Sequence, residues 1–285
     1  MKTRPGGIGR LASHDVSRIG YGAMQLARLR DDRPAAMALL RRAVELGVDH
    51  VDTAHVYGAG FVNGLVRDAL RPTDGVVVAT KVGIDPDPNG RFPMRPAQRP
   101  EDLRATVQDN LRSLGVDRLD LVYLRRFDAG ARMPLADDQV VDLEDQLAAL
   151  VAMRDEGTVG AVGLSAVDLD GLKRAVPAGI AAVQNAYSLL HREHEDLLDV
   201  CRAEGIAWVP FYPLGGASPG LPKVTDDPAV RAAADDLAAT PAQVGLAWLL
   251  QHAPNVLLIP GTGNAEHLAA NLAAGGLNVQ DAALT

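Results

Sequence analysis

The sequence alternates eight short apolar runs with segments of helical periodicity. Each run has a length and composition typical of a strand, and the connections between runs are too short to form a second domain. A strand followed by a helix, repeated eight times, is typical of a closed (β/α)8 TIM barrel, an α/β fold that commonly takes ~250 residues. The runs begin near residues 18, 48, 76, 119, 158, 180, 206 and 255. We therefore expect a single barrel domain over residues 1–285.

Helix start and stop signals between the runs favour the same alternation. One helical segment has Pro34 in its first turn and stops at Gly47, and another begins at Pro100 and stops at Gly115. Proline suits the first turn of a helix, and glycine suits the residue after its last turn. The stretch 6–20 precedes the first barrel run and carries its own turn, so we expect a short N-terminal β-hairpin that closes the bottom of the barrel.

Composition excludes several classes of protein. Hydrophobic residues make up 47% of the 285 positions, and the net charge is −8, which repels polyanions, so we expect no nucleic-acid partner. No apolar stretch approaches the ~20 residues of a membrane span, and the N-terminus lacks the apolar core of a secretory signal. We expect a cytoplasmic protein with no membrane partner. Nothing in the sequence indicates association, so we expect a monomer.

Chemistry-bearing residues follow two neighbouring runs. Asp52 ends the second run, Tyr57 stands in the loop after it, and Lys81 ends the third run. Active sites of such barrels lie at the C-terminal ends of the strands, so we expect these three side chains within hydrogen-bonding reach. A lysine ammonium would lower the pKa of a tyrosine from its ordinary value near ~10 and make it a usable general acid. The alternative is a plain ion pair beside an aromatic residue at the rim.

The motif DTAxxYG, followed by a strand ending in ATK, resembles the aldo-keto reductase superfamily. The resemblance extends over nearly the whole chain, through GYGAM at 20, LRRAVELGVDHVDTA at 40, LRSLGVDRLDLVYL at 111, VGLSA at 162, VQNAYSLL at 183, WVPFYPL at 208, PAQVGLAWLL at 241 and IPGTGNAEHLAANL at 259. Members of that family are NAD(P)H-dependent carbonyl reductases on a (β/α)8 barrel. The resemblance implies that Asp52, Tyr57 and Lys81 are three of four catalytic residues, and that Tyr57 protonates a small carbonyl substrate as nicotinamide delivers hydride.

The fourth catalytic position departs from the family pattern. The family usually has histidine in a DLxxLH motif, where this chain has Arg125. A permanent cation there could polarise the carbonyl, or bind an anionic group of the substrate. It could instead turn away to pair with Asp52 or Asp128. Some relatives that lack the histidine resemble pyridoxal reductases, so a pyridoxal-like aldehyde is a substrate hypothesis.

The resemblance also implies a nicotinamide site. It places Ser165 and Gln184 at the carboxamide and Phe211 against the ring, whose flat apolar face suits an aromatic neighbour. Ala166 stands where the family usually has asparagine, so one hydrogen bond to the cofactor is missing unless Asn185 supplies it. Segments 83–100 and 125–138 are long for connections at this rim, and we expect them to shape substrate access.

The remaining residues of the predicted cofactor site come from three segments. They are Gly22, Ala23, Met24, Leu214, Gly215, Gly261, Thr262, Gly263, His267 and Asn271. Asn264 is expected to cap a helix whose N-terminus favours phosphate. Gly261 and His267 stand where the family often has lysine and arginine, which leaves fewer positive charges for a 2′-phosphate. We expect NADPH as the cofactor, with NADH as the alternative.

Two other functions stay open. A barrel lyase could form a Schiff base at Lys81, although a lysine held charged by Asp52 is a poor nucleophile. A cofactor-binding redox sensor with little turnover would explain both Arg125 and Ala166. His191 and His194 stand at helical spacing but lack a third ligand in the pattern, so no metal site is predicted.

Overall fold

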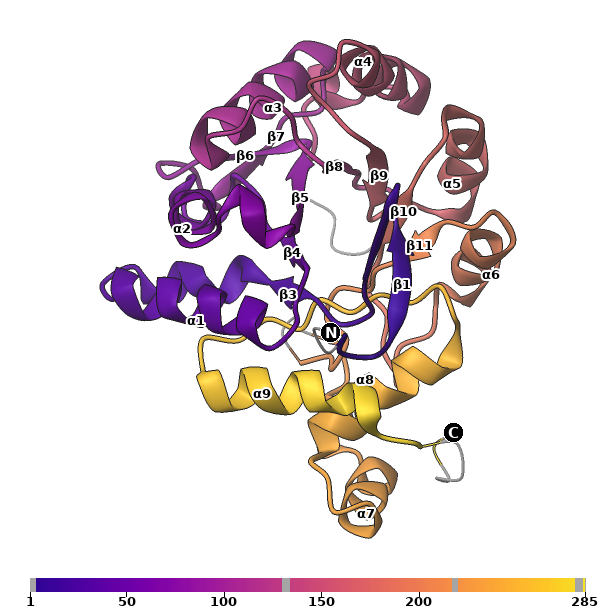
Figure 1. The fold of residues 1–285 in the computed structure, drawn as a ribbon. Coiled ribbons are helices and arrows are strands. Elements are labelled where there is room, and N and C mark those ends of the chain that lie inside the picture. Colours follow the sequence, from indigo (N-terminus) through magenta and orange to yellow (C-terminus); the bar gives the residue numbers. More distant parts are fainter. Residues whose placement is uncertain (1–3, 130–133, 217–219, 280–283, 285) are drawn as a thin grey trace.

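The computed structural model describes residues 4–129, 134–216, 220–279 and 284. Its central element is a seven-stranded parallel sheet in the order β11-β10-β9-β8-β5-β4-β3. The strands of this sheet are β3 (Tyr21–Gly22), β4 (His50–Asp52), β5 (Val77–Val82), β8 (Leu121–Arg125), β9 (Val162–Ser165), β10 (Ala182–Gln184) and β11 (Ala207–Trp208). Figure 1 shows the sheet curled inside a ring of helices.

The eighth apolar run closes the curled sheet. Val256 forms a parallel bridge to Trp208 of β11, and Leu258 forms one to Ile19, just before β3. Backbone hydrogen bonds of 2.8 Å join the Leu257 amide to the Trp208 carbonyl and the Gly20 amide to the Leu258 carbonyl. The two edges of the sheet are thereby joined through this run, and the predicted (β/α)8 barrel is confirmed.

The α-helices surround the sheet (Figure 1). They are α1 (Arg33–Glu45), α2 (Phe61–Ala69), α3 (Pro100–Leu114), α4 (Leu143–Asp155), α5 (Leu169–Ala175), α6 (Glu195–Ala203), α7 (Pro228–Asp236), α8 (Pro241–His252) and α9 (Ala265–Ala273). The exception is α7, which lies outside the ring against α8 (Figure 1). Short 3-10 helices cover Ala23–Leu29, Pro72–Asp74, Asp137–Gln139, Val176–Ala178, Val224–Asp226 and Ala274–Gly276. The predicted end signal of α3 is confirmed, since Gly115 caps it in the left-handed conformation with φ 68°.

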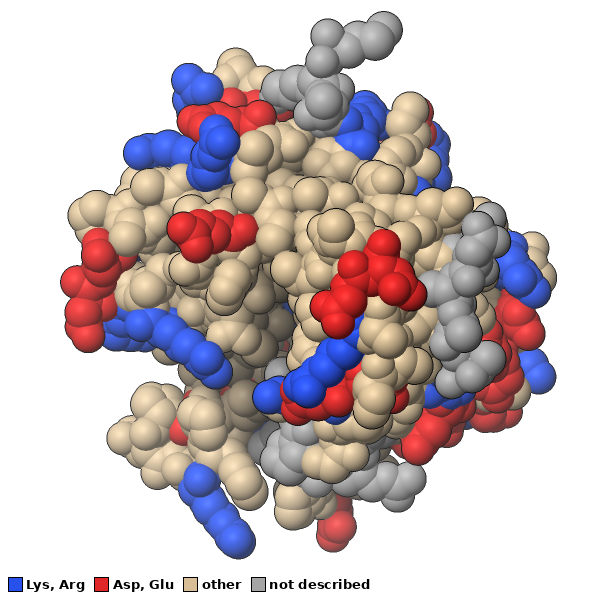
Figure 2. Space-filling view, turned by 90° about the horizontal axis from the view of Figure 1, so that it is seen from below, with Lys and Arg blue, Asp and Glu red and all other residues tan. Residues whose placement is uncertain are grey.

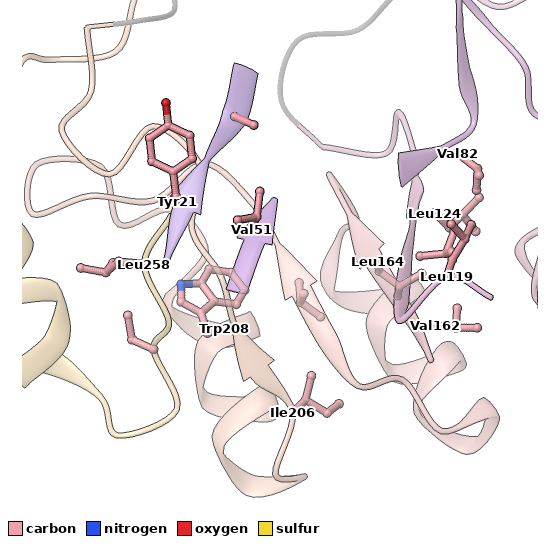
Figure 3. Packing of buried hydrophobic residues seen from close by; sticks show 14 of the residues in the cluster. Tyr21, Val51, Val82, Leu119, Leu124, Val162, Leu164, Ile206, Trp208 and Leu258 are labelled. Carbon is pink, nitrogen blue, oxygen red and sulfur yellow. The ribbon is translucent and has the colours of Figure 1, made fainter. Parts of the chain in front are cut away.

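The main apolar core lies between the sheet and the helices. Figure 3 shows part of this core, with labelled side chains from β3, β4, β5, β8, β9 and β11. Fully burying one large aliphatic side chain stabilises the fold by roughly 1.5–3 kcal/mol, so this core holds the ring of helices against the barrel. The strand positions at the site are therefore set by packing on both sides of the sheet.

A second core fills the barrel from below. The hairpin of β1 (Ile8–Leu11) and β2 (His14–Ser17) places Leu11 and Val16 in a buried cluster with barrel residues such as Leu121 and Leu257. The predicted N-terminal hairpin that closes the bottom of the barrel is thus confirmed. A second hairpin, of β6 (Ile84–Pro86) and β7 (Met94–Pro96), lies in the connection after β5.

The described surface is mixed in charge on the side seen in Figure 2, where basic and acidic side chains are interspersed. That side therefore shows no broad basic area of the kind that nucleic acid requires. Among the described helices, none combines the length and apolar character needed to cross a membrane.

Candidate active site

A cavity of about 460 Å³ opens at the C-terminal ends of the strands. Five adjacent strands each contribute one polar side chain at or near their last residue. These are Asp52 of β4, Lys81 of β5, Arg125 of β8, Ser165 of β9 and Gln184 of β10. The parallel register therefore brings together residues that lie far apart in the sequence, such as Asp52 and Gln184, which are 132 positions apart.

The centre of the site is a buried ion pair. The Lys81 ammonium contacts the Asp52 carboxylate and donates to the Thr53 carbonyl at 3.1 Å. Gln184 Nε2 donates to the other Asp52 oxygen at 2.6 Å. Burial by itself lowers the pKa of Lys81, but the charges of Asp52 and Tyr57 and their hydrogen bonds raise it overall. Lys81 is thereby held as an ammonium with a fixed direction.

Tyr57 lines the cavity beside this pair. The Lys81 Nζ lies 5.2 Å from the centroid of the Tyr57 ring. Burial raises the pKa of Tyr57, and although Lys81 and, to a smaller extent, Arg125 lower it, the pKa is raised overall. The sequence prediction of a lowered pKa is therefore wrong for this structure, because loss of solvent around the phenol outweighs the neighbouring cations.

The loop that carries Tyr57 is held by its own backbone and by a helix. Gly58, Ala59 and Gly60 have φ values of 64°, 53° and 85°, a left-handed run that turns the chain directly into α2. Glycine adopts this conformation without a steric penalty. The His55 ring lies 3.3 Å from the Ser113 hydroxyl of α3 and does not line the cavity. His55 thus anchors the loop.

Sequence reasoning missed a buried polar network beneath the site. Thr53 donates to Asn63 of α2 at 2.8 Å, Asn63 donates to Asn110 of α3 at 3.0 Å, and Thr80 also donates to Asn110. Asn110 Nδ2 donates to the Lys81 carbonyl at 3.3 Å. An available signal was Asn110 itself, a polar residue on the mainly apolar buried face of α3. The network joins two helices to the strand ends that carry Asp52 and Lys81.

The two adjacent arginines at the end of β8 have different surroundings. Arg126 donates to both carboxylate oxygens of Asp128, at 2.8 and 2.9 Å, and also contacts Gln146. Arg125 lines the cavity, with its guanidinium 5.5 Å from the Phe211 ring and Nη1 3.4 Å from the Ser165 hydroxyl. No described carboxylate forms an ion pair with Arg125, so the alternative of pairing with Asp52 or Asp128 is wrong. Burial lowers the pKa of Arg125.

Most of the predicted cofactor residues face this cavity. Those that line it are Gly22, Met24, Ser165, Gln184, Phe211, Leu214, Gly215, Gly261 and Asn271. The Oε1 atom of buried Gln184 receives no hydrogen bond from a described residue. Asn185 does not face the cavity, because both ends of its amide bind the backbone of Val167 at 3.2 and 2.8 Å. Asn185 is therefore not free to supply the hydrogen bond that an asparagine in place of Ala166 would make.

Four predicted cofactor residues lie outside the cavity lining. Ala23 is fully buried, and Thr262 is buried with its carbonyl accepting from the Tyr21 hydroxyl at 2.5 Å. Gly263 and His267 are exposed at the start of α9. The cap of this helix is confirmed, since the Asn264 side chain accepts from the amides of residues 266 and 267 at 2.8 and 3.0 Å.

The apolar walls of the cavity were mostly missed from the sequence. Further lining residues are Gln25, Val56, Ile84, Met94, Phe127, Tyr212, Pro213, Ile259 and Pro260. Ile84, Met94 and Phe127 belong to the two long connections that were expected to shape access. Residues 130–133 of one connection and 217–219 of the loop after Gly215 lie outside the described residues. Within the described residues, no group of three or more His, Cys, Asp or Glu side chains could hold a metal ion.

Comparison with known proteins places this geometry in a family. The sequence model of the aldo/keto reductase family matches residues 18–284. The chain belongs to the aldo/keto reductase family. Pyridoxine 4-dehydrogenase of Escherichia coli K12 is 40% identical to it over 282 residues, which cover 96% of this chain and 95% of the relative. A probable aldo-keto reductase of Glycine max is 31% identical, over 91% of this chain and 81% of the relative.

Solved structures agree with the assignment of this aldo-keto reductase. An aldo-keto reductase from Klebsiella pneumoniae in complex with NADPH superposes with a TM-score of 0.78 at 25% identity, over 95% of this chain and 89% of that one. A thermostable aldo-keto reductase bound to the inhibitor epalrestat gives 0.79 at 26% identity, over 96% of both chains. The predicted family, barrel fold and oxidoreductase class are thus confirmed.

Proposed function

We propose that this aldo-keto reductase uses NADPH to reduce an aldehyde or ketone to the alcohol, with Tyr57 as the proton donor. The observation that carries the proposal is the buried Asp52–Lys81 pair beside Tyr57 in a cavity with apolar walls. When bound, NADPH supplies the hydride that adds to the carbonyl carbon. The residues of the chain then have to bind the substrate, exclude water and deliver one proton to the carbonyl oxygen.

The residues present fit a nicotinamide cofactor. Gln184 Oε1 is a buried acceptor without a described partner, which a carboxamide N–H would satisfy. The Ser165 hydroxyl and the Phe211 ring line the same cavity and would bind the carboxamide and the ring face. The rest of the cofactor path would be lined by Gly22, Met24, Leu214, Gly215, Gly261 and Asn271, with the exposed Gly263 and His267 at its adenosine end. Ala23 and Thr262 would contribute only through the backbone they position.

Tyr57 has the protonation state that reduction requires. Its raised pKa keeps the hydroxyl protonated at neutral pH, so the proton is present when the carbonyl oxygen gains negative charge. The phenolate that remains is stabilised by the Lys81 ammonium. Asp52 keeps Lys81 charged and oriented, and Gln184 holds the second Asp52 oxygen. A proton donor and the cation that stabilises its conjugate base are thus placed before substrate arrives.

Arg125 suits a substrate that carries an oxyanion next to the carbonyl group. A half-buried guanidinium without a described carboxylate partner gains most from an anionic ligand, because its own desolvation is otherwise uncompensated. The neighbouring Phe127, Phe211 and Tyr212 favour a flat aromatic ring. A pyridoxal-like aldehyde combines a phenolic oxygen, an aromatic ring and an aldehyde. The relative named pyridoxine 4-dehydrogenase supports the same substrate class.

The two other functions are less well supported. A Schiff base requires a neutral lysine, but the pKa of Lys81 is raised by Asp52 and Tyr57 despite burial. A sensor without turnover requires a disabled proton donor, whereas Tyr57 faces the cavity beside Lys81.

The direct test is NADPH consumption with pyridoxal and with an activated aromatic aldehyde, in the wild type and in Tyr57→Phe. We expect the variant to lose about 10²- to 10⁴-fold in turnover, the usual contribution of a general acid, while NADPH binding measured by fluorescence is retained. Circular dichroism verifies that the variant is folded. NADPH binding without turnover of either aldehyde by the wild type would contradict the proposal and favour the sensor.

A further inference from the structure

A second cavity, of about 440 Å³, opens at the opposite end of the barrel. It lies between the tip of the N-terminal hairpin and the segments that lead into β8, β9, β10 and β11. Its lining residues are Arg10, Ala12, Ser13, His14, Arg118, Asp120, Arg154, Gly160, Ala161, Gly179, Ala181 and Gly205. None of them takes part in the proposed reduction.

The walls of this bottom cavity are built from small residues. The backbone at Gly160 passes so close to the backbone of Asp120 that only glycine fits there, since a Cβ would lie 2.5 Å from the Asp120 carbonyl oxygen. Gly179 and Gly205 end helical segments with φ values of 75° and 68°, a conformation that favours glycine. Alanine and glycine therefore form much of the cavity wall, and the long polar side chains stand at its border.

Three guanidinium groups border this space. Arg10 donates to the Ala12 carbonyl at 3.1 Å and to Asp15 at 2.8 Å, and Arg154 donates to the Ala178 carbonyl at 2.9 Å. Backbone carbonyls therefore restrict the orientation of the Arg10 and Arg154 side chains, and each guanidinium keeps further N–H groups that make no such bond. Arg118 has no hydrogen bond, ion pair or ring contact with any residue in the described part of the chain.

Carboxylates lie near these arginines, but none of them forms an ion pair with Arg118 in the described part of the chain. Asp120, the carboxylate in the lining, accepts the Val78 amide at 2.8 Å. Asp15 is mostly exposed in its pair with Arg10, and Asp155 is 3.9 Å from Arg154, so both pairs are weak. His14 in the same lining adds a further N–H donor.

From these observations we infer that the bottom cavity binds a small anion that carries phosphate. Guanidinium groups pair with phosphate oxygens through two parallel hydrogen bonds, and three arginines around one space match the several oxygens of a phosphate or diphosphate. The volume lies within the ~300–1,000 Å³ typical of small-molecule sites. The anion bridges the hairpin, through Arg10 and His14, to the barrel at Arg118 and to α4 at Arg154. Binding therefore strengthens the attachment of the hairpin.

Calorimetric titration with inorganic pyrophosphate tests this site, in low salt and with NADPH kept saturating so that the cofactor site is filled. The proteins are the wild type, Arg118→Ala and the matched control Arg112→Ala. Arg112 is an exposed arginine of α3 paired with Asp109, so the control removes the same charge away from the cavity. We expect binding to the wild type and the control, and at least tenfold weaker binding to Arg118→Ala.

Thermal unfolding with and without pyrophosphate gives an independent readout that does not depend on turnover. A ligand that binds the native state raises its stability, so Tm increases in the wild type and the control but not in Arg118→Ala. Absence of binding to the NADPH-saturated wild type would overturn the inference. Equal affinities of the wild type and Arg118→Ala would also overturn it, because the anion would then bind elsewhere.

Discussion

The two ends of the barrel handle charge in different ways. At the C-terminal end, Asp52 and Lys81 are buried and paired, and Gln184 holds the second Asp52 oxygen, so neighbouring groups fix the positions of both and raise the pKa of Lys81. At the N-terminal end, Arg118 is exposed and without a described partner. The two proposals follow this difference: a buried pair with fixed geometry suits acid–base chemistry, whereas an exposed cation without a described partner suits the binding of an anion. The difference also separates the proposed catalytic site from the attachment of the hairpin.

The largest effect on stability is expected at the C-terminal end, from Lys81→Met. The change leaves the Asp52 carboxylate buried without its cation, which costs about 3–5 kcal/mol in free energy of unfolding. Turnover is also lost, because the Tyr57 phenolate loses its stabilising charge. Urea unfolding measures the first effect, with the exposed Lys173→Met as the control. A loss of stability equal to that of the control would show that the pair is not buried in solution.

A core change at the N-terminal end tests whether stability and catalysis are separable. Leu11→Ala removes a side chain that is 2% exposed and packs between the hairpin and the barrel. We expect the free energy of unfolding to fall by about 2–3 kcal/mol. This value is near the lower end for such substitutions, because the hairpin can shift to fill part of the cavity. We expect kcat/KM to stay close to that of the wild type at temperatures where the variant is folded. A large fall in kcat/KM under those conditions would mean that the hairpin also positions the site.

The smallest effect is expected in the pH profile of Arg125→Met. Because the pKa of Tyr57 is raised, reduction should stay constant through neutral pH and decline only above the ordinary tyrosine pKa of ~10. Arg125 lowers the pKa of Tyr57, so its removal destabilises the phenolate and moves this decline to still higher pH. Arg126→Met is the matched control, since Arg126 is occupied by Asp128. An identical profile in Arg125→Met and the wild type would exclude this electrostatic role.

The sequence by itself determined the architecture and indicated where the candidate site lies. Apolar periodicity is a local property, because it records which side of a strand or helix faces the core, and eight repeats of one pattern leave few topologies other than a barrel. The DTAxxYG motif and the ATK strand end then indicated Asp52, Tyr57 and Lys81, because parallel strands place their C-terminal ends together. Arg125 was also identified from its position in a motif, although its contacts with Ser165 and Phe211 were not.

Only the tertiary structure decided the direction of the pKa shifts of Tyr57 and Lys81 and the partners of the site residues. The direction of the Tyr57 pKa shift is a balance between desolvation and neighbouring cations, and each depends on atoms brought together from several strands. Gln184 binds Asp52 from 132 positions away, and Asn110 supports the Lys81 backbone from α3. Arg125 and Arg126 are the same residue type at adjacent positions, yet Arg125 faces the cavity, whereas Arg126 forms an ion pair with Asp128. Burial and hydrogen-bond geometry depend on such long-range contacts, which local sequence patterns do not encode.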